Sequence, residues 1–105
     1  MAQKKIIRQL HQFRERVSKD TPVARMILFG SQAWGKPHRD SDIDLLIVSP
    51  NFKGQKSFRR GLSFYKHWNL HHPVDFLCYT PQEFEKLRKQ ITLVREAAEK
   101  GVEVE

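Results

Sequence analysis

Two aspartates open the most apolar stretch of the chain. Asp42 and Asp44 stand at the start of residues 43–48 (IDLLIV), a β-branched run typical of a strand covered on both faces. Side chains two residues apart in a strand project from the same sheet face, so the two carboxylates repel each other and resist desolvation. A divalent cation relieves that conflict, and Mg²⁺ is commonly held by one or two carboxylates together with substrate phosphates. The pair indicates a metal site, with an acidic, solvated turn at residues 40–44 as the alternative.

A glycine–serine pair precedes the aspartates. Gly30 and Ser31 directly follow residues 24–29 (ARMILF), a short apolar run that is a second strand candidate. Glycine lets the backbone turn sharply and approach a ligand closely. If a helix begins near Ser31, its free N–H groups and dipole favour a phosphate, and the serine hydroxyl adds a donor. An ordinary strand-to-helix turn, with Ser31 as N-cap, is the alternative for the pair taken alone.

Together the two signals form a specific motif. Gly30 and Ser31, ten residues, and then Asp42-Ile43-Asp44 resemble the Gly-Ser-x10-Asp-x-Asp pattern of the DNA polymerase beta-like nucleotidyltransferase superfamily. Asp75, within Val74-Asp75-Phe76, corresponds to the third catalytic carboxylate of that superfamily. The resemblance is to its minimal nucleotidyltransferase (MNT) branch and covers residues 24–104. It rests further on Ala33, Gly35, residues 41–45 (SDIDL), 79–84 (YTPQEF), 93–97 (LVREA) and 101–102 (GV).

The resemblance implies roles for these residues. Gly30 and Ser31 would hold the triphosphate, Asp42 and Asp44 would bind two Mg²⁺ ions, and Asp75 would complete one metal site and act on the attacking hydroxyl. The implied reaction moves a nucleoside monophosphate, AMP from ATP, to an acceptor hydroxyl and releases pyrophosphate. Two metals about 4 Å apart can stabilise both oxygens of such an in-line displacement. For Asp75 alone, a solvent-facing aspartate is the alternative.

The same resemblance points to a partner. Many minimal nucleotidyltransferases resemble antitoxins paired with a HEPN-domain ribonuclease toxin, and some transfer AMP to a tyrosine of that partner. A site this small implies help from a second chain, either such a partner or another copy. A non-catalytic antitoxin that neutralises its partner stoichiometrically is the competing interpretation, and a basic RNA-binding or RNA-end-modifying protein is a third. The sequence does not identify the base, the acceptor or the oligomeric state.

Basic residues near the motif are further candidates. Lys36 and Arg39 lie between Ser31 and Asp42 and could contact phosphate, with a solvated loop as the alternative. A second basic cluster could receive a polyanionic acceptor, or could simply begin a solvated helix. Its members are Lys53, Lys56, Arg59 and Arg60.

Composition sets the wider limits. The chain has 105 residues and a formal charge of +7, which favours polyanionic partners without choosing among them. No apolar run approaches the roughly 18 residues of a membrane helix, and the first residues lack the apolar core of a secretory signal. The single cysteine, Cys78, excludes an internal disulfide and a cysteine-based zinc site, and is expected to be a buried small apolar residue in a strand. We expect one domain, residues 1–105, in the cytoplasm.

The remaining elements must position the motif. Apolar residues at helical spacing predict an amphipathic helix over residues 3–17 and another over residues 56–69 (Phe58, Leu62, Tyr65, Trp68). Residues 74–79 (VDFLCY) form a third strand candidate. A capping box at residues 80–83 (TPQE) predicts a helical region that extends to residue 100, with a break near residues 90–92, and residues 102–105 could add a short strand. The predicted fold class is α/β (α+β), a small mixed sheet packed with helices in the nucleotidyltransferase (polymerase beta-like) fold.

Overall fold

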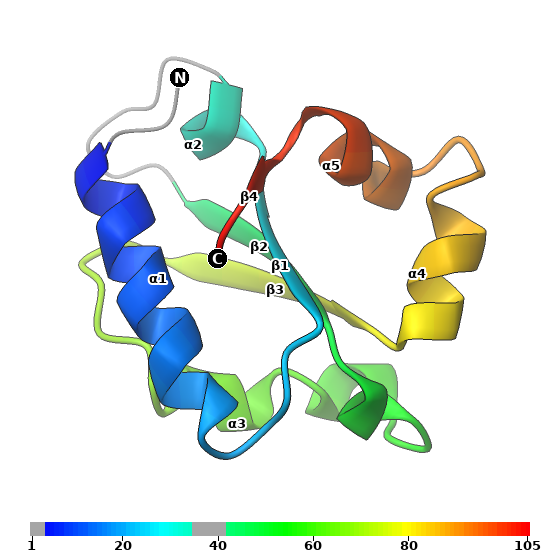
Figure 1. Cartoon of the computed structure of the whole chain (residues 1–105), viewed down its shortest axis with the longest axis horizontal. Coiled ribbons are helices and arrows are strands. Elements are labelled where there is room, and N and C mark those ends of the chain that lie inside the picture. The colour runs from blue at the N-terminus through cyan, green and yellow to red at the C-terminus, as the bar shows by residue number, and fades with distance from the viewer. Residues whose placement is uncertain (1–3, 35–41) are drawn as a thin grey trace.

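The chain forms one four-stranded mixed sheet with helices on both faces (Figure 1). The computed structural model describes residues 4–34 and 42–105. The elements are α1 (Lys4–Ser18), β1 (Arg25–Phe29), α2 (Ser31–Trp34), β2 (Ile43–Val48), the 3-10 turns η1 (Pro50–Phe52) and η2 (Ser57–Arg59), α3 (Leu62–Tyr65), β3 (Val74–Tyr79), α4 (Pro81–Leu87), α5 (Leu93–Lys100) and β4 (Val102–Glu103). This α+β architecture confirms the predicted fold class. None of the helices in the described ranges is long and apolar enough to cross a membrane.

The strands lie in the order β3-β2-β1-β4. β1 is antiparallel to both of its neighbours, whereas β2 and β3 run parallel. β2 is therefore an interior strand, buried at five of its six positions, as its unbroken apolar sequence predicts. Only Asp44, half-buried, interrupts that pattern. Because β2 begins where β1 ends, the residues that follow β1 and those that open β2 meet at one end of the sheet (Figure 1).

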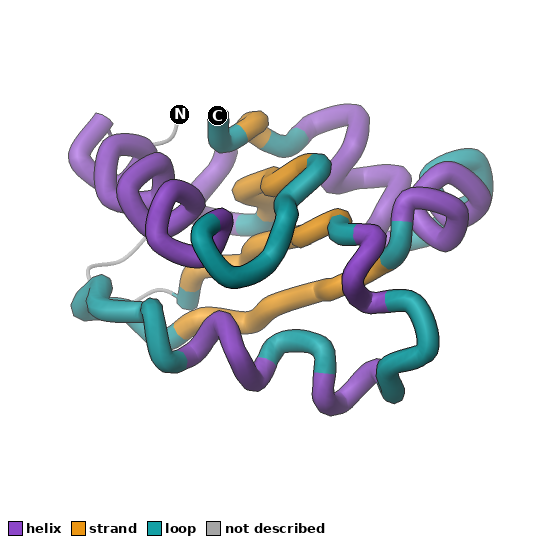
Figure 2. Tube along the Cα trace, turned by 60° about the horizontal axis from the view of Figure 1, so that its bottom comes forward, coloured by secondary structure: helices purple, strands orange, loops and turns teal. Residues whose placement is uncertain are grey.

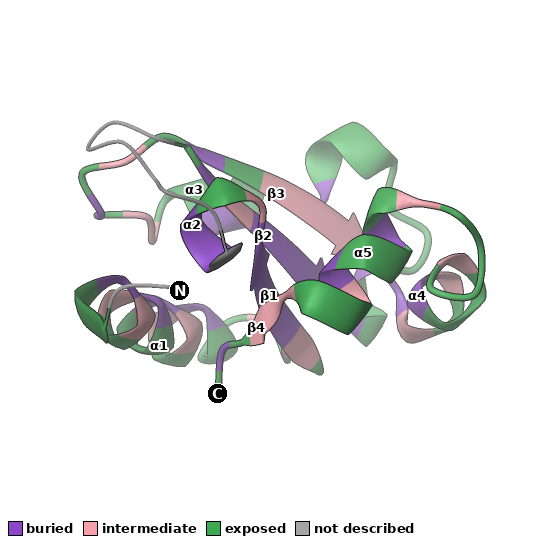
Figure 3. Cartoon of the chain, turned by 90° about the horizontal axis from the view of Figure 1, so that it is seen from above, coloured by how far each residue is buried: buried purple, intermediate pink, exposed green. Residues whose placement is uncertain are grey.

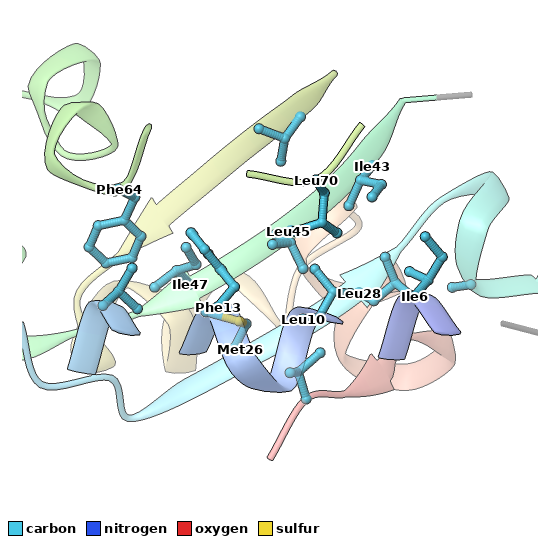
Figure 4. Close-up of a cluster of buried hydrophobic side chains, with 14 of the residues drawn as sticks. Ile6, Leu10, Phe13, Met26, Leu28, Ile43, Leu45, Ile47, Phe64 and Leu70 are labelled. Atoms are coloured by element: carbon cyan, nitrogen blue, oxygen red, sulfur yellow. The ribbon is translucent and has the colours of Figure 1, made fainter. Parts of the chain in front are cut away.

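Alternate strand residues supply the two cores. One face carries Leu45 and Ile47 of β2 and packs under α1 and the α3 region (Figure 4). The other face carries Leu46 and Val48 and packs under α4 and α5 (Figure 3). Asp44 shares the parity of Leu46, so its side chain belongs to the α4/α5 face. That placement separates the motif from the aromatic-rich core on the opposite side.

The predicted N-terminal helix is confirmed, and its apolar stripe packs into the larger of the two cores. Ile6, Leu10, Phe13 and Val17 are all buried in α1. Phe13 is the centre of an aromatic group, stacked on Phe76 with ring centroids 5.8 Å apart and meeting Trp68 edge-on at 5.1 Å. Such pairs add directional energy to the area that they bury.

The C-terminal strand and helices follow the sequence closely. Thr80 accepts a hydrogen bond from the Glu83 N–H, and the Glu83 carboxylate accepts one from the Thr80 N–H, which completes the predicted capping box. The helical region is broken as expected, because Thr92 caps a new helix at Leu93. α5 ends at Gly101, and β4 then pairs with β1.

The prediction of one helix over residues 56–69 is wrong. The segment is the short turn η2 followed by the four-residue α3 (Figure 2). Three of the four residues of the predicted apolar stripe are exposed, and the fourth, Trp68, packs against the core. Phe58, Leu62 and Tyr65 are 71%, 61% and 48% exposed, whereas Phe64 and Arg60 are buried. Gly61 separates the two pieces, and a Cβ there would already lie 3.4 Å from the Phe76 side chain. The residues that turn inward are Phe64, which joins the core, and Arg60, which pairs with Glu83.

Arg60 is consequently not part of an exposed basic cluster. Its guanidinium donates to both carboxylate oxygens of Glu83 and to the Cys78 carbonyl, 3.2 Å away. The Tyr65 hydroxyl donates to the Val74 carbonyl at 3.3 Å. Both side chains therefore occupy outward carbonyls of β3, an edge strand that would otherwise offer a template for strand pairing. Lys53, Lys56 and Arg59 remain exposed.

Candidate active site

Three side chains form one row across the sheet at the end where β2 begins. Phe29 of β1 pairs with Asp44 of β2, and Asp44 pairs with Asp75 of β3. Asp75 has the parity of Leu77, so both aspartates belong to the sheet face under α4 and α5. Like charges on paired residues of neighbouring strands destabilise a sheet. The fold thus brings two carboxylates from distant parts of the sequence together where their repulsion serves no structural purpose.

Gly30 lies beside this row, and its lack of a side chain makes room for the Asp44 carboxylate. Its φ is +77°, a left-handed conformation that glycine adopts without strain. A Cβ built at this position would lie 2.4 Å from Oδ2 of Asp44, far inside van der Waals contact. Two features therefore favour glycine at this position: the left-handed turn from β1 into α2, and the Asp44 carboxylate, which occupies the space that a side chain would fill. Ser31, exposed, is the first residue of α2.

The electrostatics of Asp44 reflect its neighbours. Burial raises the pKa of the Asp44 carboxyl above its usual value, and the charges of Asp75 and Asp42 raise it further. Asp42 is exposed and lies one residue before β2, close enough for its charge to act on Asp44. A positive charge placed among the three would reverse this effect by stabilising the ionised carboxylates.

A pocket of about 430 Å³ opens beside the row, within the usual range for small-molecule sites. Gly30, Asp44 and Asp75 form its polar side. Phe29, Phe76, Leu77, Leu93 and Glu96 form the rest of its lining. Among the described residues, Asp42 and Ser31 do not line it. The structure therefore brings three of the predicted site residues into one pocket and leaves two at its margin.

Two further predictions lie outside the described residues. Lys36 and Arg39 belong to residues 35–41, so their phosphate contacts stay predictions.

The donor set suits a hard divalent cation that shares its ligands with a substrate. Within residues 4–34 and 42–105, no three His, Cys, Asp or Glu side chains are gathered closely enough to hold a metal ion by themselves. One or two carboxylates are enough for Mg²⁺, because this ion completes its octahedral coordination with waters and substrate phosphates rather than with protein ligands alone. The two carboxylates line a pocket that is wide enough for such a ligand approach.

Comparison with known proteins identifies the family. The model of the nucleotidyltransferase domain family matches residues 10–102, nearly the whole chain. The chain belongs to this family. The solved structure of a protein from Sulfolobus solfataricus, provisionally identified as a nucleotidyltransferase, has the same fold: the TM-score is 0.64 at 24% identity, over 78% of this chain and 73% of that one. A search of curated proteins found no significant match.

Sequence reasoning missed five of the eight residues that line the pocket of this nucleotidyltransferase domain. Leu77 could have been inferred, because it stands two residues after Asp75 on the same strand. Leu93 and Glu96 carry no local signal, since only the packing of α5 on the sheet brings them to the site. The resemblance to the superfamily is confirmed by the family match, whereas the MNT branch and its HEPN partner stay predictions.

Proposed function

We propose that this nucleotidyltransferase domain transfers AMP from ATP to an acceptor hydroxyl in a Mg²⁺-dependent reaction. The observation that carries the proposal is the row in which Asp44 and Asp75 are paired on adjacent strands, beside a glycine whose missing side chain makes room for the Asp44 carboxylate. Structural stability alone gives no reason to pair two carboxylates there. Binding of cations and phosphates does.

Each site residue has a distinct task in this proposal. Asp42 and Asp44 hold the metal side of the site, and Asp75 serves both the metal and the acceptor. Bound Mg²⁺ would neutralise phosphate charge and favour ionisation of the acceptor hydroxyl. The acceptor oxygen bonds to the α-phosphorus as the bond to the pyrophosphate oxygen breaks, and the hydroxyl proton leaves toward Asp75 or solvent. Asp75 is exposed on an edge strand, so an acceptor on another macromolecule can approach it.

Gly30 and Ser31 would orient the triphosphate. The left-handed turn at Gly30 directs the chain from β1 into α2 beside Asp44, and the exposed Ser31 hydroxyl offers a donor. Phosphoryl transfer depends mainly on positioning and charge neutralisation, so a site with few residues suffices. Lys36 and Arg39 would add positive charge to the same phosphates.

Label transfer tests the reaction. The purified protein, Mg²⁺ and a lysate of its own source are incubated with α-labelled or γ-labelled ATP. We expect α-label, and not γ-label, on a discrete acceptor band, and loss of that band with Asp42→Asn or Asp44→Asn. Asp20→Asn is the matched control, because it removes a carboxylate that pairs with His67 on the surface. Label that survives both site substitutions would refute the proposal.

A second candidate, stoichiometric binding to a partner, is favoured by the outward apolar stripe. Phe58, Leu62 and Tyr65 are large, apolar and exposed together, with Lys56 and Arg59 beside them. Exposed apolar patches of this kind mark protein interaction sites. We propose this stripe as the surface for a HEPN-type partner, and for an antitoxin role. Neither of these is needed for nucleotidyl transfer itself.

The two candidates separate on two substitutions. Phe58→Ser should weaken a co-expressed partner complex without removing label transfer to a small acceptor, while Asp44→Asn should remove transfer and leave the complex intact. If Asp44→Asn still protects cells from the partner, neutralisation is by binding alone; if protection is lost, catalysis is required. Steep salt dependence of RNA affinity would instead favour the nucleic-acid interpretation. A cytoplasmic location stays a prediction from composition.

A further inference from the structure

The helix α5 contributes two residues, Leu93 and Glu96, to the pocket that Asp44 and Asp75 line. This helix packs on the sheet through Val94 and Ala97, which are buried, and this orientation turns Leu93 and Glu96 toward the pocket. Residues three apart on a helix lie side by side. Leu93 is 62% exposed, which leaves its side chain free to contact a ligand.

Glu96 differs from the paired residues Arg95 and Glu99 on the same helix. Arg95 and Glu99 pair with each other at 3.0 Å. The Glu96 carboxylate, in contrast, has no hydrogen bond or ion pair within the part of the chain that the structure describes. A free carboxylate on an open surface is unremarkable, but this one lines the pocket that contains Asp44 and Asp75. Its acceptor oxygens are available to whatever enters.

The charges in the pocket restrict what Glu96 can contact. The triphosphate that we assign to this site is itself anionic, so a third carboxylate near it would be repulsive. The phosphates therefore belong at the Gly30 end, and Glu96 must face a part of the substrate that donates hydrogen bonds. The pocket lining also includes the apolar side chains of Phe29, Leu77 and Leu93. A flat apolar group with an N–H donor at its edge satisfies both conditions.

We propose that Leu93 and Glu96 form the nucleobase subsite, in which Glu96 accepts a hydrogen bond from an exocyclic amino group. Adenine, cytosine and guanine carry such a group, and uracil does not. The subsite rests on the proposed nucleotidyltransferase function and adds base selection to it. Leu93 supplies contact area for any base, whereas Glu96 discriminates among them. Hydrogen bonds to charged acceptors are stronger than neutral ones, and from that we expect about tenfold weaker binding when the amino group is absent.

Calorimetric titration with Mg²⁺ and two purine nucleotides tests the subsite directly. ATP and purine riboside triphosphate differ only in the 6-amino group. The wild-type protein should bind ATP about tenfold more tightly, and UTP should be similarly disfavoured. Glu96→Ala should bring the two purine nucleotides to equal affinity. Glu99→Ala is the matched control, since it removes the same charge from the same helix at a residue that does not line the pocket.

A Leu93→Ala protein provides the second measurement. It should weaken binding of all nucleotides while it preserves the ratio between ATP and purine riboside triphosphate. Equal affinity of the wild-type protein for those two ligands, or an unchanged ratio in Glu96→Ala, would overturn the subsite and leave the proposed function standing. Absence of binding to all four common nucleoside triphosphates would instead overturn the proposed function.

Discussion

Replacing Gly30 with alanine separates the backbone role of this glycine from its role beside Asp44. The chain contains two glycines with left-handed φ angles among its described residues, Gly30 at +77° and Gly54 at +80°. A Cβ at Gly54 would meet no atom within 4 Å, whereas a Cβ at Gly30 would lie 2.4 Å from Asp44 Oδ2. Gly54→Ala is therefore a control with the same backbone strain and no contact.

The expected losses of stability for Gly54→Ala and Gly30→Ala follow from that comparison. Forcing an L-residue into the left-handed region costs about 1–2 kcal/mol, so Gly54→Ala should lower the melting temperature by roughly 5–10 °C in a domain of this size. Gly30→Ala carries the same strain plus the contact. Because the contacted atom is the tip of a side chain, Asp44 can rotate away, and the additional loss of stability should stay within about 1 kcal/mol.

Activity should distinguish the variants far more than stability does. Rotation of Asp44 moves a carboxylate away from its position in the row, and misplacement by about 1 Å can lower a catalysed rate roughly 100-fold. We expect a loss of that order in label transfer for Gly30→Ala and little change for Gly54→Ala. The assay compares initial rates well below both melting temperatures, so that both proteins are folded.

A background substitution makes the reasoning refutable. With Asp44→Ala already present, Gly30→Ala should destabilise only as much as Gly54→Ala, because the contacted carboxylate is gone. Retention of wild-type transfer by the single Gly30→Ala protein would show that the Asp44 position is not critical. A loss above about 4 kcal/mol that persists in the Asp44→Ala background would show that the glycine is needed by the backbone alone.

Three further predictions concern titrating groups. Burial and the charge of Asp75 raise the pKa of Asp44, so ionisation of this carboxyl group destabilises the fold as pH rises. Asp44→Asn should therefore raise the melting temperature in metal-free buffer at neutral pH but not in acid, which melting curves from pH 3 to pH 8 in the presence of chelator would check. The hydrogen bond from Arg60 lowers the pKa of Glu83, so the ionised Glu83 stabilises the fold above the usual pKa of a glutamate, and this stabilisation is lost as pH falls through the lowered pKa. Glu83→Gln should flatten that part of the plot of melting temperature against pH. Burial raises the pKa of the Cys78 thiol to about 12, so alkylation at pH 8 should be slow in the folded protein and fast in denaturant; rapid native labelling would contradict this.

The sequence predicted the elements well where one physical cause acts alone. α1 follows from its apolar stripe, and the capping box at Thr80 follows from local hydrogen bonding. Residues 56–69 failed because two causes compete. Helical spacing of Phe58, Leu62 and Tyr65 indicated an inward face, but the segment instead buries Phe64 in the core and Arg60 against Glu83. Periodicity alone does not contain that tertiary constraint.

The site residues, too, divide into those that local spacing predicts and those that depend on tertiary packing. Gly30 and Asp44 lie close together in the sequence, and the antiparallel register that pairs Phe29 with Asp44 places the glycine beside the carboxylate. Such a relation is local enough to leave a motif in the sequence. The pairing of Asp44 with Asp75 depends on a parallel register across a long connection, and the position of Glu96 depends on how α5 packs. The residues that we assign to phosphate and metal can therefore be predicted from sequence spacing. The residues that we assign to the base could be found only from the fold, which is why base preference was among the properties that the sequence left open.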